Sequence, residues 1–298
     1  MKRTIDDYIL NVLKPLNSKK VIVTGCTSGI GLALSRILAF KNAYLIMAVR
    51  NVLKGNLLKD KLLAEFPKAK IDVVHLDQGD FSSIDKFVTK IKTSYPDFDS
   101  LVLNAGVFNT NKGIVLDNGY PIVSGTNMFG PIYLVNELIK FDNQCKHKII
   151  FQGSLAKNKS KYKNFDSAFM NSFRSHFEQY NLSKLGLYNA FNYFHNNRSE
   201  NYSFFWAEPG ISGTEIIRKY PTKFKKFAQK MMNALFAKPL EACLPVASII
   251  NNDLPSGVSV APGGVLHAKG LPSFIKFNPR IINPEIMEKA LESIYERK

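Results

Sequence analysis

A tyrosine and a lysine four residues apart, Tyr180 and Lys184, are the side chains in this sequence best suited to proton transfer. On a helix, positions i and i+4 lie on one face, one turn apart, so Lys184 can hold its ammonium group near the Tyr180 hydroxyl. A nearby positive charge favours phenolate and lowers the pKa of a tyrosine from its reference value of about 10. The pair therefore predicts an acid or base that works closer to neutral pH.

A glycine-rich turn lies far upstream, at residues 24–31, with the sequence TGCTSGIG. Gly25 permits a tight turn, while Gly29 and Gly31 let the backbone approach a pyrophosphate closely. The N–H groups and dipole of the following helix favour that negative charge. Many glycine-rich turns serve only as turns, but the apolar strand before this one and the apolar helix after it favour a dinucleotide site.

The choice of nucleotide depends on the end of the second predicted strand, which carries Arg50 and Asn51 and no acid. An acidic side chain there would bind a free ribose 2′-hydroxyl and repel a 2′-phosphate, whereas a guanidinium group suits phosphate. We therefore expect NADP(H) in preference to NAD(H). Asp77 follows the third predicted strand and is expected to accept a hydrogen bond from the adenine amino group, although an aspartate there can also serve as a cap.

Strands and helices alternate along the chain in a way that positions these residues at one edge of a sheet. Buried strands are predicted at residues 21–23, 44–49, 71–76, 101–103, 148–152 and 203–207. Helical patterns lie between them, including one over 81–95, one over about 126–141 and a long helix that carries Tyr180 and Lys184. This alternation predicts an α/β fold, a doubly wound Rossmann-type parallel sheet with helices on both faces in a single domain. We expect a helical extension at residues 1–17 before a domain at 18–298.

Composition and charge limit the class of protein and its partners. Hydrophobic residues make up 45% of the 298 residues, which is typical of a globular domain. The longest apolar runs are too short to cross a bilayer, no signal-peptide pattern is present, and three scattered cysteines favour a reducing, cytoplasmic setting. The formal charge of +16 is open to a nucleic-acid, membrane or anionic-ligand interpretation, but a lysine-rich solvated surface explains it most simply.

The ordered motifs closely resemble the short-chain dehydrogenase/reductase family over residues 18–215. The matching elements are TGCTSGIG, Asp77, Asn104-Ala105-Gly106, Asn127, Ser154, the YNLSK segment around Tyr180 and the PGISGT segment at 209–214. Within the family, residues 45–51 and 75–77, with the 26 positions between Ser154 and Tyr180, resemble the retinol dehydrogenase and protochlorophyllide reductase branch. That branch uses NADP(H). One departure is Gly153, where the branch more often has serine.

The resemblance implies a role for each motif residue. Tyr180 would donate a proton to a substrate carbonyl, Ser154 would hold the substrate oxygen, and Lys184 would bind the nicotinamide ribose and bias Tyr180. Asn127 would position a water that links Lys184 to solvent. The expected cofactor-binding residues are Gly25, Thr27, Ser28, Gly29, Ile30, Gly31, Arg50, Asn51, Asp77, Asn104, Ala105, Gly106, Tyr180, Lys184, Pro209, Gly210, Ile211 and Thr214. We expect no metal, because the five histidines lack ligand spacing.

Two segments are expected to shape the substrate pocket. Phenylalanines at 165, 169, 173 and 177 have the i+4 spacing of one aromatic stripe on a helix. Residues 222–238 read as a basic amphipathic helix within a lid at about 212–245, which either covers the pocket or contacts an anionic membrane peripherally. The aromatic and methionine-rich lining favours a bulky, apolar ketone or aldehyde.

Three functions remain open on the sequence alone. The leading one is an NADP(H)-dependent oxidoreductase that interconverts a carbonyl and an alcohol on a small-molecule substrate. The alternatives are NADPH-dependent reduction of a carbon–carbon double bond and a non-catalytic NADP-binding regulator with a basic surface for nucleic acid, which intact Ser154, Tyr180 and Lys184 disfavour. The family also suggests a homodimer or homotetramer, an inference by analogy.

Overall fold

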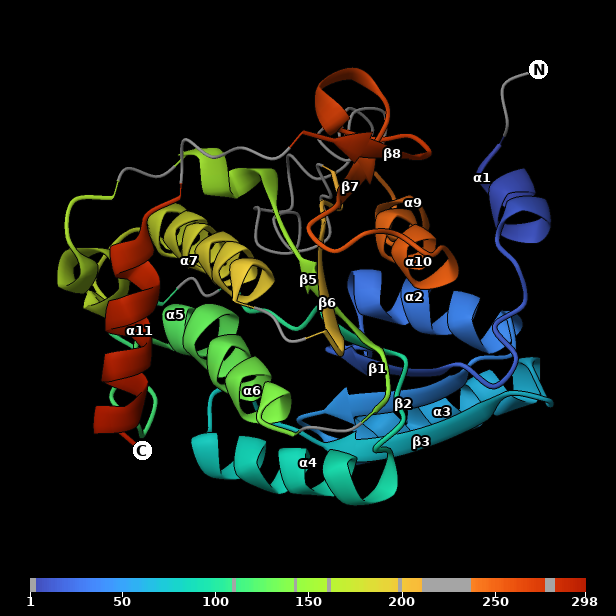
Figure 1. The fold of residues 1–298 in the computed structure, drawn as a ribbon, viewed down its shortest axis with the longest axis horizontal. Helices are drawn as coiled ribbons and strands as arrows, with labels where there is room; N and C mark the ends of the chain where they lie inside the picture. The colour runs from blue at the N-terminus through green and yellow to red at the C-terminus, as the bar shows by residue number, and fades with distance from the viewer. Residues whose placement is uncertain are drawn as a thin grey trace, which may run out of the picture.

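A central β-sheet carries the loops on which the motif residues lie (Figure 1). The structure is a computed structural model, and it describes residues 4–108, 111–141, 144–159, 162–197, 200–210, 237–276 and 282–298. Its strands are β1 (Lys20–Thr24), β2 (Tyr44–Val49), β3 (Lys70–His75), β4 (Ser100–Leu103), β5 (His147–Gln152), β6 (Tyr202–Ala207), β7 (Ser259–Pro262) and β8 (Pro272–Ile275).

The strand order within these residues is β3-β2-β1-β4-β5-β6-β7-β8. Every neighbouring pair is parallel except β7 and β8, which pair antiparallel at one edge. The order reverses between β1 and β4, and the crevice at such a switch point is where doubly wound sheets bind ligands. The predicted α/β, doubly wound parallel sheet is confirmed.

Helices cover both faces of the sheet. On the N-terminal side of the chain they are α1 (Ile5–Asp7), η1 (Tyr8–Val12), α2 (Gly29–Phe40), α3 (Val52–Glu65), α4 (Phe81–Ser94), α5 (Ile122–Ser124), η2 (Gly125–Phe129) and α6 (Gly130–Ile139). The remaining ones are η3 (Leu155–Lys159), η4 (Asp166–Met170), α7 (His176–Asn196), α9 (Pro239–Ala242), α10 (Leu244–Asn251), η7 (Val265–His267) and α11 (Pro284–Glu296). None of the helices described is both long and apolar enough to span a bilayer.

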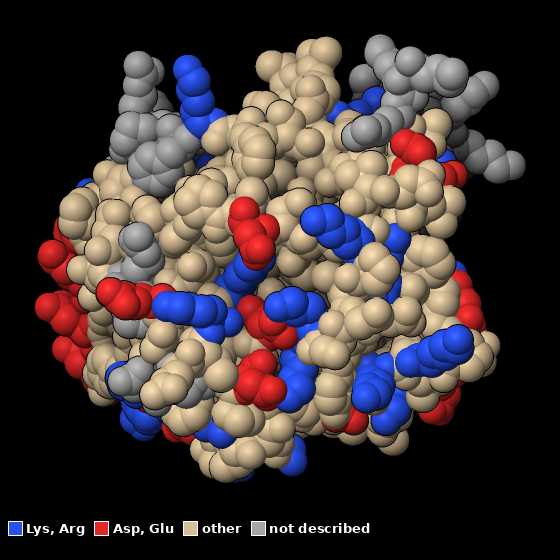
Figure 2. Space-filling view, turned by 45° about the vertical axis from the view of Figure 1, so that its right-hand side comes forward, with Lys and Arg blue, Asp and Glu red and all other residues tan. Residues whose placement is uncertain are grey.

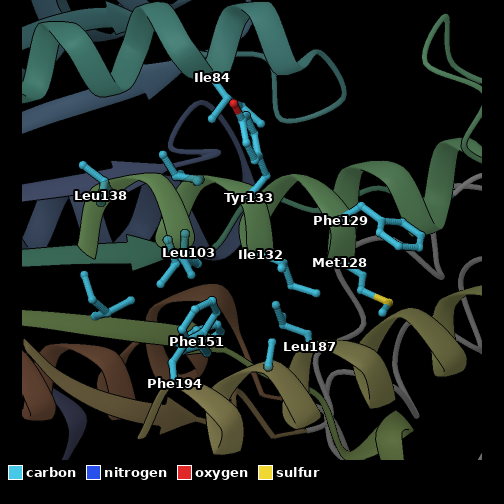
Figure 3. Close-up of a cluster of buried hydrophobic side chains, with 14 of the residues drawn as sticks. Ile84, Leu103, Met128, Phe129, Ile132, Tyr133, Leu138, Phe151, Leu187 and Phe194 are labelled. Carbon is cyan, nitrogen blue, oxygen red and sulfur yellow. The ribbon is translucent and has the colours of Figure 1, made fainter. Parts of the chain in front are cut away.

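Two hydrophobic cores hold these layers on the sheet. One lies under α4, α6, α7 and α11, where Tyr133 of α6 points toward Ile84 of α4 and Ile132 of α6 points toward Leu187 of α7 (Figure 3). The other lies under α2 and α10 and includes Leu34, Val102 and Ile249. Because side chains alternate across a strand, Leu101 and Leu103 enter the first core while Val102 enters the second. This explains why the strands read as continuous apolar runs.

The N-terminal helix is shorter than predicted. The extension over 1–17 was expected to be helical as far as about Pro15, but the described helix ends at Val12, and Leu13 has extended backbone with φ −71° and ψ 120°. Tertiary contacts replace the next turn, since Leu16 N–H donates to the Lys41 carbonyl and Lys14 exchanges hydrogen bonds with Asn251. After Val12 the segment therefore continues as non-helical chain packed on the second hydrophobic core, beside α2 and α10.

The predicted phenylalanine stripe is also wrong. Residues 165 and 169 are buried against the first core, but the chain leaves helical structure at Asn171 and enters α7 only at His176. Phe173 and Phe177 are consequently exposed, by 72% and 53%. Regular spacing in the sequence did not reveal this break, because no glycine or proline marks it.

Surface charge on the described residues is mixed. Figure 2 shows lysine and arginine side chains interspersed with aspartate and glutamate over one face of the molecule. Among the described residues, Lys19 forms an ion pair with Asp99 and Arg36 with Glu65. The face in Figure 2 therefore carries basic and acidic side chains side by side.

Candidate active site

One cavity of about 920 Å³ lies at the carboxyl ends of the strands and collects most of the predicted residues. The predicted residues among those that line it are Gly25, Thr27, Ser28, Gly29, Ile30, Gly31, Arg50, Asn51, Asp77, Asn104, Ala105, Gly106, Ser154, Tyr180, Lys184, Pro209 and Gly210. They come from loops after β1, β2, β3, β4, β5 and β6 and from α7. The parallel sheet brings them together because all six strands end at the same edge.

The glycine turn is locked to the loop after β4. The hydroxyl oxygen of Thr24 accepts hydrogen bonds from the N–H groups of Asn104, at 3.0 Å, and Ala105, at 2.9 Å. The Asn104 amide donates to the carbonyl oxygens of Thr24 and Gly25. A Cβ atom at Gly31 would lie only 2.3 Å from the Gly25 carbonyl oxygen, so this approach requires glycine.

The start of α2 faces the cavity with unsatisfied donors. Ser28 occupies the N-cap position but makes no side-chain capping bond, which leaves N–H groups of the first turn available. Ser28, Gly29 and Ile30 all line the cavity, and nothing lies within 4 Å of a Cβ built on Gly29. A helix N-terminus of this kind binds anions, so the cradle fits the pyrophosphate of a dinucleotide.

The loop after β2 presents positive charge to the same cavity. Arg50 lines it and so does Lys54, which sequence reasoning missed although it follows Arg50 at helical i+4 spacing. The Asn51 side chain caps α3 instead, accepting a hydrogen bond from Lys54 N–H at 2.9 Å. Two cations at the end of the second strand suit a phosphate group better than a free hydroxyl.

Asp77 lies at the far end of the cavity beside the turn after β3. One of its carboxylate oxygens accepts from Gly79 N–H at 2.9 Å, and its own N–H donates to the Ser83 hydroxyl. Asp80, not Asp77, caps α4, by accepting from Ser82 N–H. Asp77 thus caps the turn at Gly79 rather than α4, and its place in the cavity wall is compatible with contact to a nucleotide base.

Ser154, Tyr180 and Lys184 meet at the other end of the cavity. Ala156 N–H donates to the Ser154 hydroxyl oxygen at 3.2 Å, which leaves the hydroxyl hydrogen for another acceptor. The Lys184 ammonium is buried, donates to the Gln152 carbonyl at 3.0 Å and lies 5.8 Å from the centre of the Tyr180 ring. A lysine cation at this distance from a ring centre makes a cation–π contact, which fixes the two side chains relative to each other.

Asn127 supports the cavity wall from behind. It is 1% exposed and is not among the lining residues. Its side chain accepts from Val107 N–H at 2.7 Å and donates to the Val107 carbonyl at 2.9 Å and to the Ser183 hydroxyl at 3.2 Å. Asn127 thus ties the loop after β4 to the helix that carries Tyr180, and its role with water stays a prediction.

Three apolar side chains complete the catalytic end: Phe177, which was assigned to the pocket from the sequence, and Phe108 and Leu266, which were not. Phe108 packs edge-on against both Phe177, with ring centres 5.3 Å apart, and Tyr180, at 5.5 Å. Leu266, from the turn between β7 and β8, also lines the cavity and has the left-handed φ of 50°. No local pattern could assign Leu266, because 82 residues separate it from Lys184 and only the sheet brings them together.

Cys26 and the arrangement of possible metal ligands also bear on the chemistry of the site. Burial raises the pKa of the Cys26 thiol, inside the glycine turn, to about 12, so this cysteine stays protonated and unreactive at neutral pH. No group of three or more histidine, cysteine, aspartate or glutamate residues within the described ranges is placed to hold a metal ion.

Part of the expected site lies outside the described residues. Ile211 and Thr214 fall there, as do most of the lid predicted at 212–245 and of the basic helix predicted at 222–238. The described end of that lid forms α9 and the start of α10.

Comparison with known proteins agrees with this architecture. The family model for short chain dehydrogenases matches residues 19–165. A protochlorophyllide reductase of Daucus carota is 32% identical over 152 residues, which cover 49% of this chain and 37% of that protein. The chain matches only 30% to 45% of the length of the first curated relatives.

Solved structures extend the similarity to the whole chain. An uncharacterized protein from Mycobacterium paratuberculosis has a TM-score of 0.73 at 22% identity, covering 100% of this chain and 97% of its own. A short chain dehydrogenase of Shigella flexneri, complexed with NADP, has a TM-score of 0.61 at 17% identity over 81% of this chain and 94% of its own. The chain is thus similar to short chain dehydrogenases in sequence over residues 19–165, about half of its length, and in fold over 81% of it.

Gly153 departs from the related branch for a reason visible in the structure. A Cβ atom there would lie 2.2 Å from Cζ2 of Trp206, whose ring is fully buried. The indole therefore occupies the space that a serine side chain would need.

Restoring serine by Gly153→Ser should lower the free energy of unfolding by about 1–3 kcal/mol, the usual effect of overpacking a core. Thermal or urea unfolding measures this. Gly79→Ala is the control, because its Cβ meets only the side-chain ends of Leu116 and Asp77, at 3.2–3.3 Å. Equal stability of Gly153→Ser and wild type would show that the indole yields freely.

Proposed function

We propose that this protein is an NADP(H)-dependent oxidoreductase that interconverts a carbonyl and an alcohol on a bulky, apolar small molecule. The observation that carries the proposal is that Ser154, Tyr180 and Lys184 line one cavity with the glycine turn. Each residue alone has a structural explanation. Together, in a cavity that fits a dinucleotide, they form an acid–base and oxyanion-stabilising set.

The residues of this chain divide the work as follows. Gly25, Gly31 and the start of α2 hold the pyrophosphate, and the bound nicotinamide supplies the hydride. The Ser154 hydroxyl donates to the substrate oxygen, where negative charge develops during reduction. Tyr180 gives its phenolic proton to that oxygen, and in the oxidative direction it accepts the proton of the alcohol. The buried Lys184 ammonium stabilises the phenolate that remains.

NADP(H) is the cofactor that the cavity favours. Arg50 and Lys54 line the wall after β2, and no acidic residue occupies the end of that strand. Their charges attract a 2′-phosphate and would gain little from a neutral hydroxyl. The similar Shigella flexneri structure contains NADP, which supports the same assignment.

Replacing Arg50 by alanine should weaken NADPH binding by about 10- to 100-fold, because a hydrogen bond to a charged group contributes about 1.5–3 kcal/mol. NADH binding should change little. Titration of cofactor fluorescence measures both constants. Arg36→Ala is the matched control, since Arg36 pairs with Glu65 outside the cavity. Tighter binding of NADH than NADPH by wild type would overturn the assignment.

The substrate class follows from the apolar rings beside the predicted acid. Phe108, Phe177 and Leu266 line the catalytic end, and Phe177 and Leu266 are exposed by 53% and 82%. Exposed apolar side chains gathered at a cavity mark a binding surface for an apolar ligand. This supports a hydrophobic aldehyde or ketone over a sugar.

Reduction of a carbon–carbon double bond is the second candidate. It is favoured by the similarity to protochlorophyllide reductase, and the same tyrosine and lysine can protonate a carbon atom after hydride transfer. A screen of NADPH oxidation across hydrophobic aldehydes, ketones and enones separates the two candidates by the product formed.

Removing the Tyr180 hydroxyl tests the shared chemistry. Tyr180→Phe should lower kcat by at least about 100-fold, within the range for loss of a positioned acid, while NADPH still binds. Tyr193→Phe, on the same helix but outside the cavity wall, is the control and should retain full turnover. Comparable kcat values for Tyr180→Phe and wild type would refute the mechanism.

A further inference from the structure

An ion pair is buried close to Ser154, and neither of its residues lines the cavity. Lys157, in η3, and Glu208, directly after β6, are 5% and 0% exposed and form an ion pair. The same glutamate oxygen accepts from the indole N–H of Trp206 at 2.7 Å. The Lys157 ammonium lies 5.1 Å from the centre of the Tyr188 ring and 5.3 Å from that of Trp206. We call Lys157, Glu208, Trp206 and Tyr188 the buried cluster.

The cluster joins three elements that border the cavity, two of which carry the proposed catalytic groups. Lys157 lies three residues after Ser154 and its N–H donates to the Ser154 carbonyl at 3.2 Å. Tyr188 lies on α7 one turn after Lys184, and its ring packs edge-on against Trp206 with centres 4.8 Å apart. Glu208 immediately precedes Pro209 and Gly210, which line the cavity. Any shift of one element relative to the others must disturb these contacts.

Stability does not explain the cluster. A buried ion pair is often no more stabilising than apolar side chains of similar volume, because desolvation offsets the attraction between the charges. Here one carboxylate oxygen of Glu208, Oε2, is buried without a hydrogen-bond partner among the described residues, which adds to that cost. Unlike an apolar contact, the ion pair fixes the orientation of its partners. An ammonium group, a carboxylate and an indole N–H form hydrogen bonds with one another in only a few geometries.

We propose that Lys157 and Glu208 are positioning residues, which hold the Ser154 hydroxyl in register with Tyr180 and so act on the catalytic step rather than on cofactor binding. The inference rests on the proposed function. Gly153 belongs to the same arrangement, since Trp206 reaches Glu208 through the space that a larger residue 153 would fill. In this proposal the cluster acts through Ser154, since its four residues are not among the described residues that line the cavity.

The test replaces both charges at once by Lys157→Met with Glu208→Leu, so that no unpaired charge is left behind. The double variant should fold, bind NADPH within about twofold of wild type and lose about tenfold or more in kcat, a change of about 1.4 kcal/mol in the activation barrier. In a Ser154→Ala background the same double change should cost less than about twofold, because coupled residues are not additive. Single-turnover oxidation of NADPH measures the slow variants.

A readout without cofactor accompanies the kinetics. Amide hydrogen exchange of residues 153–159 should become about tenfold faster in the double variant, with that of β1 unchanged, if the cluster orders the serine loop. Trp206 is the single tryptophan of the chain, so its emission maximum reports directly whether the core around it stays closed. Lys289→Met with Glu285→Leu, which removes an exposed ion pair on α11, is the matched control.

Each outcome either supports or overturns the positioning role of Lys157 and Glu208. Unchanged kcat in the folded double variant, or an equal loss in the Ser154→Ala background, would overturn the positioning role and leave the proposed function intact. Absence of NADPH oxidation by wild type with every carbonyl and enone would overturn the proposed function itself. If the double variant does not fold, Glu208→Gln keeps the shape and the acceptor for Trp206, and a kcat within twofold of wild type in that variant would equally overturn the inference.

Discussion

The bond network between Thr24 and Asn104 is the constraint on which the rest of the site depends. It joins the loops after β1 and β4, the two strands between which the order of the sheet reverses. Without it, the glycine turn and the wall formed by Ala105 and Gly106 would be separate surface loops. Because every bond involves backbone on at least one side, the network fixes the path of the chain and leaves the side chains around it to determine which ligand binds.

At the catalytic end of the cavity, buried charged side chains fix the elements relative to one another. The Lys184 ammonium is anchored on the Gln152 carbonyl, and Lys157 is paired with Glu208 one layer further from the cavity. Removing either lysine from water is costly, so both need fixed partners. The partners lie on β5 and directly after β6, which pair along their whole length. The rigidity of the sheet is thereby transmitted to the charges that surround Tyr180.

Much of the fold and of the cofactor cradle could be predicted from the sequence, because buried parallel strands and glycine turns are local signals. The strand predicted over 44–49 has those bounds in the structure. Failures arose where tertiary contacts override local pattern. The N-terminal helix ends at Val12, ahead of Pro15, and Leu16 N–H donates to the Lys41 carbonyl. The burial of Lys157 was not predicted from the sequence, and its partner Glu208 lies 51 residues away in the chain. Leu266 reaches the cavity only because β7 and β8 extend the sheet.

The C-terminal helix bears on how such a chain can assemble. Helix α11 packs beside α6 and α7 (Figure 1). Its Ile286, Met287 and Ala290 are buried in the core that it shares with these helices, and Asn283 N–H donates to Asn189 on α7 at 2.6 Å. Association of two chains through α6 and α7 would have to proceed over α11 or displace it. Displacement would expose these apolar side chains, at about 1.5–3 kcal/mol for each large one. Helix α11 thus covers α7, which carries Tyr180 and Lys184, and packs against it within one chain.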